Sequence, residues 1–176
     1  GLFQRVQEGA RIEDLNVSGS VKASSACEAA GGLAGRNEGE IENCSFSGSV
    51  SGSSTTGGLV GENTASGVIR ASKSGGAVTG SKMTGGIVGS SRGKIVDCVN
   101  GSYVNTVSGD QAISLENVNL DFSLDMTKLT TGDALLSSYD TGGITGYNAG
   151  TIRACENRAI VGYQHVGYNV GGIAGR

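Results

Sequence analysis

The stretch Gly31-Gly32-Leu33-Ala34-Gly35-Arg36-Asn37 is the most informative part of this 176-residue chain, because it recurs. The string Gly-Gly-(Leu/Ile)-x-Gly occurs five times, beginning at Gly31, Gly57, Gly85, Gly142 and Gly171. The intervals between these starts are 26, 28, 57 and 29 residues, and the longest is close to two of the others. Self-similarity at a fixed period of roughly 20–50 residues indicates a repeat architecture.

Each unit contains three short segments that favour β-structure. The glycine motif is followed by Ile41-x-Asn43-Cys44 and then by Phe46-x-Gly48-x-Val50, with turn residues between them. No complete unit carries an apolar stripe at the helical period of about 3.6 residues. Three short strands per unit suit one coil of a parallel β-solenoid, whose coils stack about 4.8 Å apart. We therefore predict an all-β fold, a single-stranded right-handed parallel β-helix.

Stacked coils place equivalent residues in columns, and these columns supply the predicted core. Three apolar columns follow from the alignment of the units. They are Leu33, Leu59, Ile87, Val107, Ile144 and Ile173; Ile12, Ile41, Ile69, Ile95, Leu115 and Ile152; and Val21, Val50, Val78, Val104, Leu124 and Val161. In the turns, we expect Asn37, Asn63 and Asn148 to bond their own backbone or to adopt the left-handed region.

The 57-residue interval is predicted to hide a degenerate coil at residues 105–141, because 115–120 match 12–17 position by position. This alignment gives about six coils in one domain. Their expected bounds are about 1–30, 31–56, 57–84, 85–104, 105–141 and 142–170, with the next coil starting at 171–176. Thr130 or Thr131 can cap a short helix, so we expect one helical excursion near 131–139.

The segments 57–63, 39–44 and 48–52 resemble the GLUG motif. GLUG repeats occur in large secreted or surface proteins of bacteria, including some proteases of the immunoglobulin A-cleaving type. The resemblance covers most of the chain, with four clear copies and weaker first and fifth ones. It implies a secreted, surface-associated architecture and no particular activity.

Composition excludes several classes of protein. The chain has 32 glycines and no proline, so it is not collagen, whose triple helix needs abundant proline. The formal net charge of −3 gives no electrostatic footprint for nucleic acid. No apolar run approaches the roughly 20 residues that cross a bilayer, so we expect no membrane insertion.

The four cysteines are predicted to be free thiols. Three of them fall in the column Leu15, Cys44, Ser72, Cys98, Val118 and Cys155, in which no two cysteines are adjacent. Cysteines two coils apart are separated by about 9.6 Å, beyond the reach of a disulfide. If residues 105–141 were instead looped out, Cys98 and Cys155 would become neighbours, and a disulfide would become possible.

Catalytic signals are weak, and we expect no enzyme activity, metal or cofactor in this segment. His165 is the single histidine, which excludes a His-Glu-x-x-His zinc site. Arg70, Arg92, Lys94 and Arg153 are candidates for the basic face of a polysaccharide lyase; the alternative is that they are solvated outward positions. The turns carry Asn, Glu or Ser rather than the Asp of calcium-binding repeats.

Two regions are candidate binding sites. Residues 102–140 contain six acidic side chains against Lys128, and within them we single out Asp121, Asp125, Asp133 and Tyr139 as a partner-binding lobe. The alternative is a helix whose leucine face packs on the solenoid. Tyr163, His165 and Tyr168 form the second candidate, because tyrosine rings stack on sugars. They can equally be turn residues along the solenoid wall.

These observations predict a non-catalytic repeat module of a bacterial cell-surface or secreted protein, acting as an adhesive or spacer solenoid. The expected partners are host glycoprotein or glycan, together with a continuation of the parent chain at the open ends of the solenoid. One alternative is a substrate-positioning domain of a larger secreted protease or hydrolase acting on host glycoprotein. The other is a carbohydrate-active β-helix.

Overall fold

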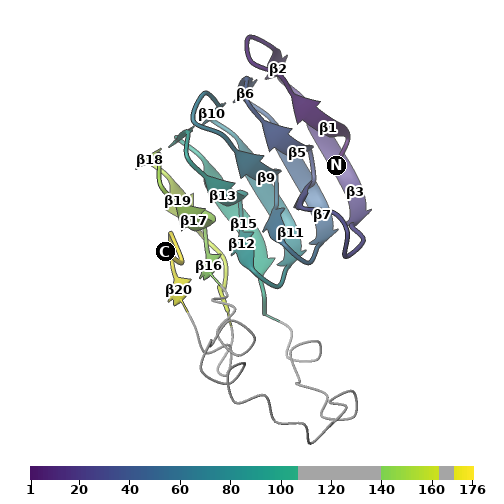
Figure 1. Ribbon diagram of the computed structural model, residues 1–176. Coiled ribbons are helices and arrows are strands. Elements are labelled where there is room, and N and C mark those ends of the chain that lie inside the picture. Colours follow the sequence, from purple (N-terminus) through teal and green to yellow (C-terminus); the bar gives the residue numbers. More distant parts are fainter. Residues whose placement is uncertain (107–139, 163–168) are drawn as a thin grey trace, which may run out of the picture.

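The computed structural model describes residues 1–106, 140–162 and 169–176, which wind about one axis as stacked β-strands (Figure 1). Every element of these residues is a strand, and the strands form four parallel sheets. The predicted all-β, parallel β-solenoid is therefore confirmed. The described residues form five turns of the solenoid, or rungs, rather than the six coils expected. The expected helix near 131–139 lies outside the described residues.

Each sheet contains one strand from every rung, and the chain visits the sheets in the order A, B, C, D. Sheet A consists of β1 (Phe3–Val6), β5 (Ala34–Asn37), β9 (Val60–Asn63), β13 (Val88–Ser91) and β17 (Thr145–Asn148). Sheet B consists of β2 (Arg11–Glu13), β6 (Glu40–Glu42), β10 (Val68–Arg70), β14 (Lys94–Val96) and β18 (Thr151–Arg153). Sheet C consists of β3 (Asn16–Lys22), β7 (Ser45–Ser51), β11 (Lys73–Thr79), β15 (Val99–Val104) and β19 (Glu156–Asn157). Sheet D consists of β4 (Ala29–Gly31), β8 (Thr55–Gly57), β12 (Met83–Gly85), β16 (Asp140–Gly142) and β20 (Asn169–Gly171). Rung 1 is β1–β4, and rungs 2 to 5 follow in sets of four.

The glycine motif is a corner and not a strand, which corrects the prediction of three strands per unit. Gly31 ends β4 in sheet D, and Ala34 begins β5 in sheet A. Gly32 and Leu33 connect the two strands, with the Leu33 side chain fully buried. Each rung therefore has four short strands, because the chain must turn once more to close around the core.

The inner members of the predicted apolar columns form the core, whereas Ile173 at the end of the stack is 40% exposed. Ile41, Ile69 and Ile95 are register partners in sheet B, and all three are fully buried. In sheet C, Val50 pairs with Val78. At the corner between sheets D and A, the Leu33 amide donates to the Leu59 carbonyl at 2.9 Å, and the same bond recurs along that column. Equivalent positions of the repeat thus become direct contacts between rungs.

The register across residues 105–141 differs from the prediction. Ile95 pairs directly with Ile152, and Asn100 pairs with Asn157, so rungs 4 and 5 are neighbours. The coil expected between them does not separate them, and that part of the alignment was wrong. Val107, Leu115 and Leu124, which it assigned to the columns, lie outside the described residues.

Two of the turn asparagines, Asn37 and Asn63, are fully buried and hydrogen-bonded to each other across rungs, whereas Asn148 is only partly buried. The Asn37 amide donates to the Asn63 side-chain oxygen at 2.9 Å and to the Gly39 carbonyl at 3.2 Å. Asn148 donates to the Gly150 carbonyl at 3.1 Å, two residues along its own chain. Of the two roles proposed for these asparagines, the structure uses the backbone hydrogen bond; none of them has a positive φ.

Candidate functional site

A long polar groove runs along the outside of the solenoid, where sheets D and A meet. Its volume is about 1590 Å³, and its lining residues come from all five rungs. Gln4 and Arg5 line it in rung 1, and Tyr147 and Arg176 line it at the opposite end of the stack. The groove therefore follows the solenoid axis rather than entering the core.

One column of sheet A supplies much of the lining. It contains Arg5, Arg36, Glu62, Ser90 and Tyr147, which are successive register partners. In four of the five rungs this residue immediately follows the last glycine of the motif. The residues that follow it, such as Asn37, Asn63 and Ser91, are fully buried, so the alternation of the strand turns this position away from the core. The site thus repeats once per rung.

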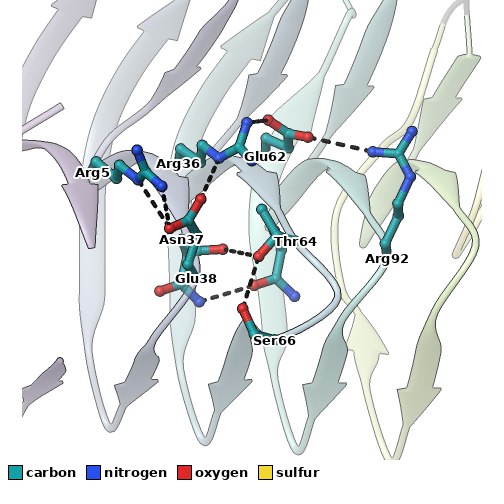
Figure 2. A network of polar contacts seen from close by, with 9 residues as sticks. Arg5, Arg36, Asn37, Glu38, Glu62, Thr64, Ser66 and Arg92 are labelled. Atoms are coloured by element: carbon teal, nitrogen blue, oxygen red, sulfur yellow. Dashed lines mark hydrogen bonds and ion pairs between the residues drawn. The ribbon is translucent and has the colours of Figure 1, made fainter. Parts of the chain in front are cut away.

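The charged side chains of the groove are ordered by an alternating chain of ion pairs, shown in Figure 2. Glu38 accepts from Arg5 Nε at 3.0 Å and from Arg36 Nε at 2.8 Å. Glu62 accepts from Arg36 Nη1 at 3.0 Å and from Arg92 Nη1 at 3.4 Å. This ion-pair network therefore links three guanidinium groups and two carboxylates from four consecutive rungs. An arginine stands at each end of the network.

This network holds the Glu38 carboxylate in its ionised form. The hydrogen bond from Arg5 is the main reason that the pKa of Glu38 lies below its ordinary value, and the bond from Arg36 adds to it. The guanidinium groups themselves remain about half exposed, at 54% for Arg5 and 46% for Arg36. Their orientation is set by the hydrogen bonds to the carboxylates.

A second cluster of polar groups closes the far end of the groove. Asp140 in β16 is fully buried, yet its carboxylate lies 3.0 Å from Arg176 Nη2 and accepts from Asn169 Nδ2 at 2.7 Å. The Arg176 guanidinium lies over the Tyr147 ring, 5.2 Å from its centre, in a cation–π arrangement. Arg176 therefore presents a positioned charge beside an aromatic ring.

None of the binding residues singled out from the sequence can be placed. Asp121, Asp125, Asp133 and Tyr139, and likewise Tyr163, His165 and Tyr168, lie outside the described residues. Both hypotheses about these regions therefore stay predictions.

The four basic residues considered for a lyase face separate into two groups. Arg70, Lys94 and Arg153 are exposed on sheet B, where Val96 lies between Arg70 and Arg153 in the register. Arg92 alone lines the groove.

The groove could not be predicted from the sequence. Its signal was present, since a hydrophilic residue follows the motif's last glycine as Arg36, Glu62, Ser90, Tyr147 and Arg176. This hydrophilic position indicates a groove only once the structure shows that sheets D and A meet at a concave corner.

Two further properties concern the described residues only. Among them, no three His, Cys, Asp or Glu side chains gather closely enough to hold a metal ion. They also contain no helix with the length and apolar character that would cross a membrane.

A comparison with known families identifies the repeat. Residues 26–51 match the family model described as the GLUG motif. This segment runs from the turn before β4 to the end of β7, and so takes one strand from each of the four sheets. Residues 26–51 are a GLUG motif. The GLUG unit therefore corresponds to one complete turn of the solenoid, and the register pairs it with equivalent units on either side. No curated protein and no solved structure matches the chain.

Proposed function

We propose that this chain is a non-catalytic GLUG-repeat module of a bacterial secreted or cell-surface protein, and that its groove binds an extended glycan. The observation that carries the proposal is the groove itself, which is lined by residues from all five rungs. The expected ligands are host glycans or glycoproteins with acidic sugars.

The shape of the groove supports an extended ligand. Stacked rungs are about 4.8 Å apart, so equivalent lining residues repeat at that interval along the axis. The groove is open along its length and continuous from Gln4 to Arg176. A small metabolite would contact one or two rungs, whereas a linear polymer can contact several and add their contributions.

The chemistry of the lining supports a carbohydrate with carboxylate groups. Guanidinium groups bind carboxylates through paired hydrogen bonds. Four arginines line the groove, and each guanidinium has five N–H donors, more than its bonds to Glu38, Glu62 or Asp140 use. Tyr147 adds an aromatic ring with a hydroxyl, which suits the mixed apolar and polar faces of a sugar. Glu38 already orders the side chains of Arg5 and Arg36. Binding of a ligand to these arginines would therefore cost little side-chain entropy.

The same network argues against a hydrolase in the groove. Glycoside hydrolysis ordinarily uses a pair of carboxyl groups, one of which gives a proton to the leaving oxygen. Both oxygens of Glu62 accept hydrogen bonds from arginines, which ties this carboxylate to Arg36 and Arg92 in the groove wall. A binding role uses these residues as they are arranged.

The test is binding of the purified chain to an immobilised panel of acidic and neutral glycans, mucin and immunoglobulin A. Arg92→Gln and Tyr147→Ala alter the groove. Matched controls are Arg153→Gln on sheet B and Tyr103→Ala on sheet C, both at exposed positions outside the groove. We expect each groove variant to weaken binding roughly tenfold, as for one charge-assisted hydrogen bond or stacking contact. The controls should bind like wild type.

Other outcomes separate the alternatives. Absence of binding across the panel would contradict the glycan-binding role and favour a spacer. Binding that is lost in the controls but kept in the groove variants would move the site to sheets B and C. Cleavage of an acidic polysaccharide by the wild-type chain would contradict the non-catalytic assignment and support a carbohydrate-active solenoid. Binding to immunoglobulin A alone would favour a substrate-positioning domain.

A further inference from the structure

Two cysteines are stacked at the same corner of consecutive rungs. Cys98 follows β14 in rung 4, and Cys155 follows β18 in rung 5. The residues two before them, Val96 and Arg153, are register partners, and so are the residues one after them, Val99 and Glu156. The two cysteines are therefore one rung apart, at about 4.8 Å between equivalent backbone atoms. This separation lies within the roughly 4.4–6.8 Å between Cα atoms that a disulfide spans.

The side chains point the same way and are unequally accessible. Each thiol donates to the carbonyl two residues earlier, Cys98 to Val96 and Cys155 to Arg153, both at 3.3 Å. Cys155 Sγ also lies 3.6 Å from the carbonyl oxygen of Ile95, which belongs to the rung of Cys98. Cys98 is completely buried, whereas Cys155 is partly exposed. An external reagent therefore meets Cys155 first.

The contact also prepares the exposed thiol for reaction. A hydrogen bond with Cys98 lowers the pKa of the Cys155 thiol to about 7, which raises the fraction of reactive thiolate near neutral pH. The same contact, together with burial, raises the pKa of Cys98. Cys155 is thus the nucleophile of the pair, and Cys98 stays protonated as a thiol.

We propose that Cys98 and Cys155 are a disulfide-forming pair that fastens rung 4 to rung 5. The bond closes into a loop the chain from Cys98 to Cys155, which includes the interval between β15 and β16. Both cysteines are free in this structure, which is the reduced form of the pair.

The bond forms by thiol–disulfide exchange with a small-molecule or protein disulfide. The Cys155 thiolate attacks one sulfur of that oxidant, which breaks its S–S bond, forms a mixed disulfide and releases the first thiolate. The Cys98 thiol then loses its proton and attacks Cys155 Sγ, which forms the Cys98–Cys155 bond and releases the second thiolate. Two cysteine thiols are oxidised by two electrons, the oxidant is reduced to two thiols, and protons are conserved.

The other two cysteines serve as internal controls. Cys44 occupies the same column two rungs from Cys98, with Ser72 between them, and the Cys44 amide donates to Ser72 Oγ at 3.1 Å. Cys27 lies in the turn before β4 and donates to the Ala29 carbonyl at 3.3 Å. Neither one has a thiol neighbour in the register.

The experiment treats the native protein with oxidised glutathione, blocks remaining thiols and maps the tryptic peptides without reductant. We expect two thiols to disappear and one cross-link to join residues 95–128, which contain Cys98, to residues 154–158, which contain Cys155. The oxidised protein should melt roughly 5–10 °C higher, and dithiothreitol should reverse the shift. Cys155→Ser should abolish the cross-link and the shift, whereas Cys44→Ser should keep both.

The proposal is overturned if the native wild-type chain keeps four reactive thiols, or if its cross-links involve Cys27 or join two molecules. A Cys98–Cys155 cross-link without a higher melting temperature would overturn the fastening role. Cys98 is buried, and its substitution can disturb folding, so the main variant is made at the partly exposed Cys155. The peptide map of the wild-type protein tests for the cross-link without any variant.

Discussion

At the residue scale, the corner between sheets B and C requires a left-handed backbone in every rung. Asp14, Asn43, Ala71, Asp97 and Ala154 occupy this position, with φ between 49° and 54°. Asn and Asp tolerate this region, whereas an ordinary residue such as alanine is strained there by about 1–2 kcal/mol. The recurrence of Asp and Asn before the cysteine column was the sequence signal for this corner. Alanine at two of the five positions obscured it.

We therefore predict that Ala71→Asn stabilises the protein. The new side chain adopts the left-handed region at less cost, and it lies beside Asn43, which already donates to Asp14 at 2.6 Å in the same column. The free energy of unfolding should rise by about 1 kcal/mol, measured by urea denaturation. The control is Ala77→Asn, at an exposed position with extended backbone in sheet C, which should give no gain. Equal effects of the two substitutions would show that the corner is not strained.

At the element scale, the paired glycines let the strands approach each other, and none of them has a positive φ. The close approach of neighbouring strands, and not a left-handed backbone, is therefore the reason for glycine at these positions. A Cβ on Gly58 would lie 2.0 Å from the Gly86 carbonyl oxygen of the next rung, and one on Gly86 would lie 2.2 Å from that of Gly143. The second glycine of the motif is therefore required because the corners of consecutive rungs stack too closely to admit a Cβ atom.

Gly58→Ala should accordingly destabilise the protein by roughly 3 kcal/mol, because the obstructing atom belongs to the backbone and cannot rotate away. Gly75→Ala is the matched control. Its Cβ would meet only Ser47 Oγ at 3.9 Å, so it should be neutral or slightly stabilising. Chemical denaturation of both variants measures the difference. If the two alanines cost the same, the packing of the corners is looser than we infer.

At the scale of the whole molecule, the stack is continuous across the interval between Asn105 and Asp140. The Asn105 amide donates to Thr141 Oγ1 at 3.0 Å, so the two ends of that interval meet within rung 4. Asn105 Oδ1 also accepts from the Gly80 amide at 2.8 Å, which holds the exit point against rung 3. The contacts between rungs 4 and 5 are made by residues on either side of that segment.

Replacing residues 107–139 by a short Gly-Ser linker should therefore leave the solenoid folded. Circular dichroism should keep its β-signal, and the melting temperature should change by only a few degrees, since loop length affects stability weakly. The same linker in place of residues 68–79 removes β10 and β11 from the middle of the stack and should abolish the cooperative transition. Unfolding of the first variant would mean that the replaced segment belongs to the stack.

The repeat alone specified much of this protein, namely the fold class and most of the core. Ile41, Ile69 and Ile95 were assigned to one column from spacing, and they are register partners. The physical reason is that a rung contacts only its neighbours, so positions that are equivalent in sequence have equivalent surroundings.

Which rungs are neighbours across the 57-residue interval could be decided only from the tertiary structure. Closing a longer loop costs little additional free energy, so spacing cannot tell a stacked coil from a segment that leaves the stack. The pairing of Ile95 with Ile152 settled that point and brought Cys98 beside Cys155. The groove depended on the fold in the same way. Its arginines are dispersed through the sequence, and they share a site because successive rungs place them side by side along the corner of two sheets.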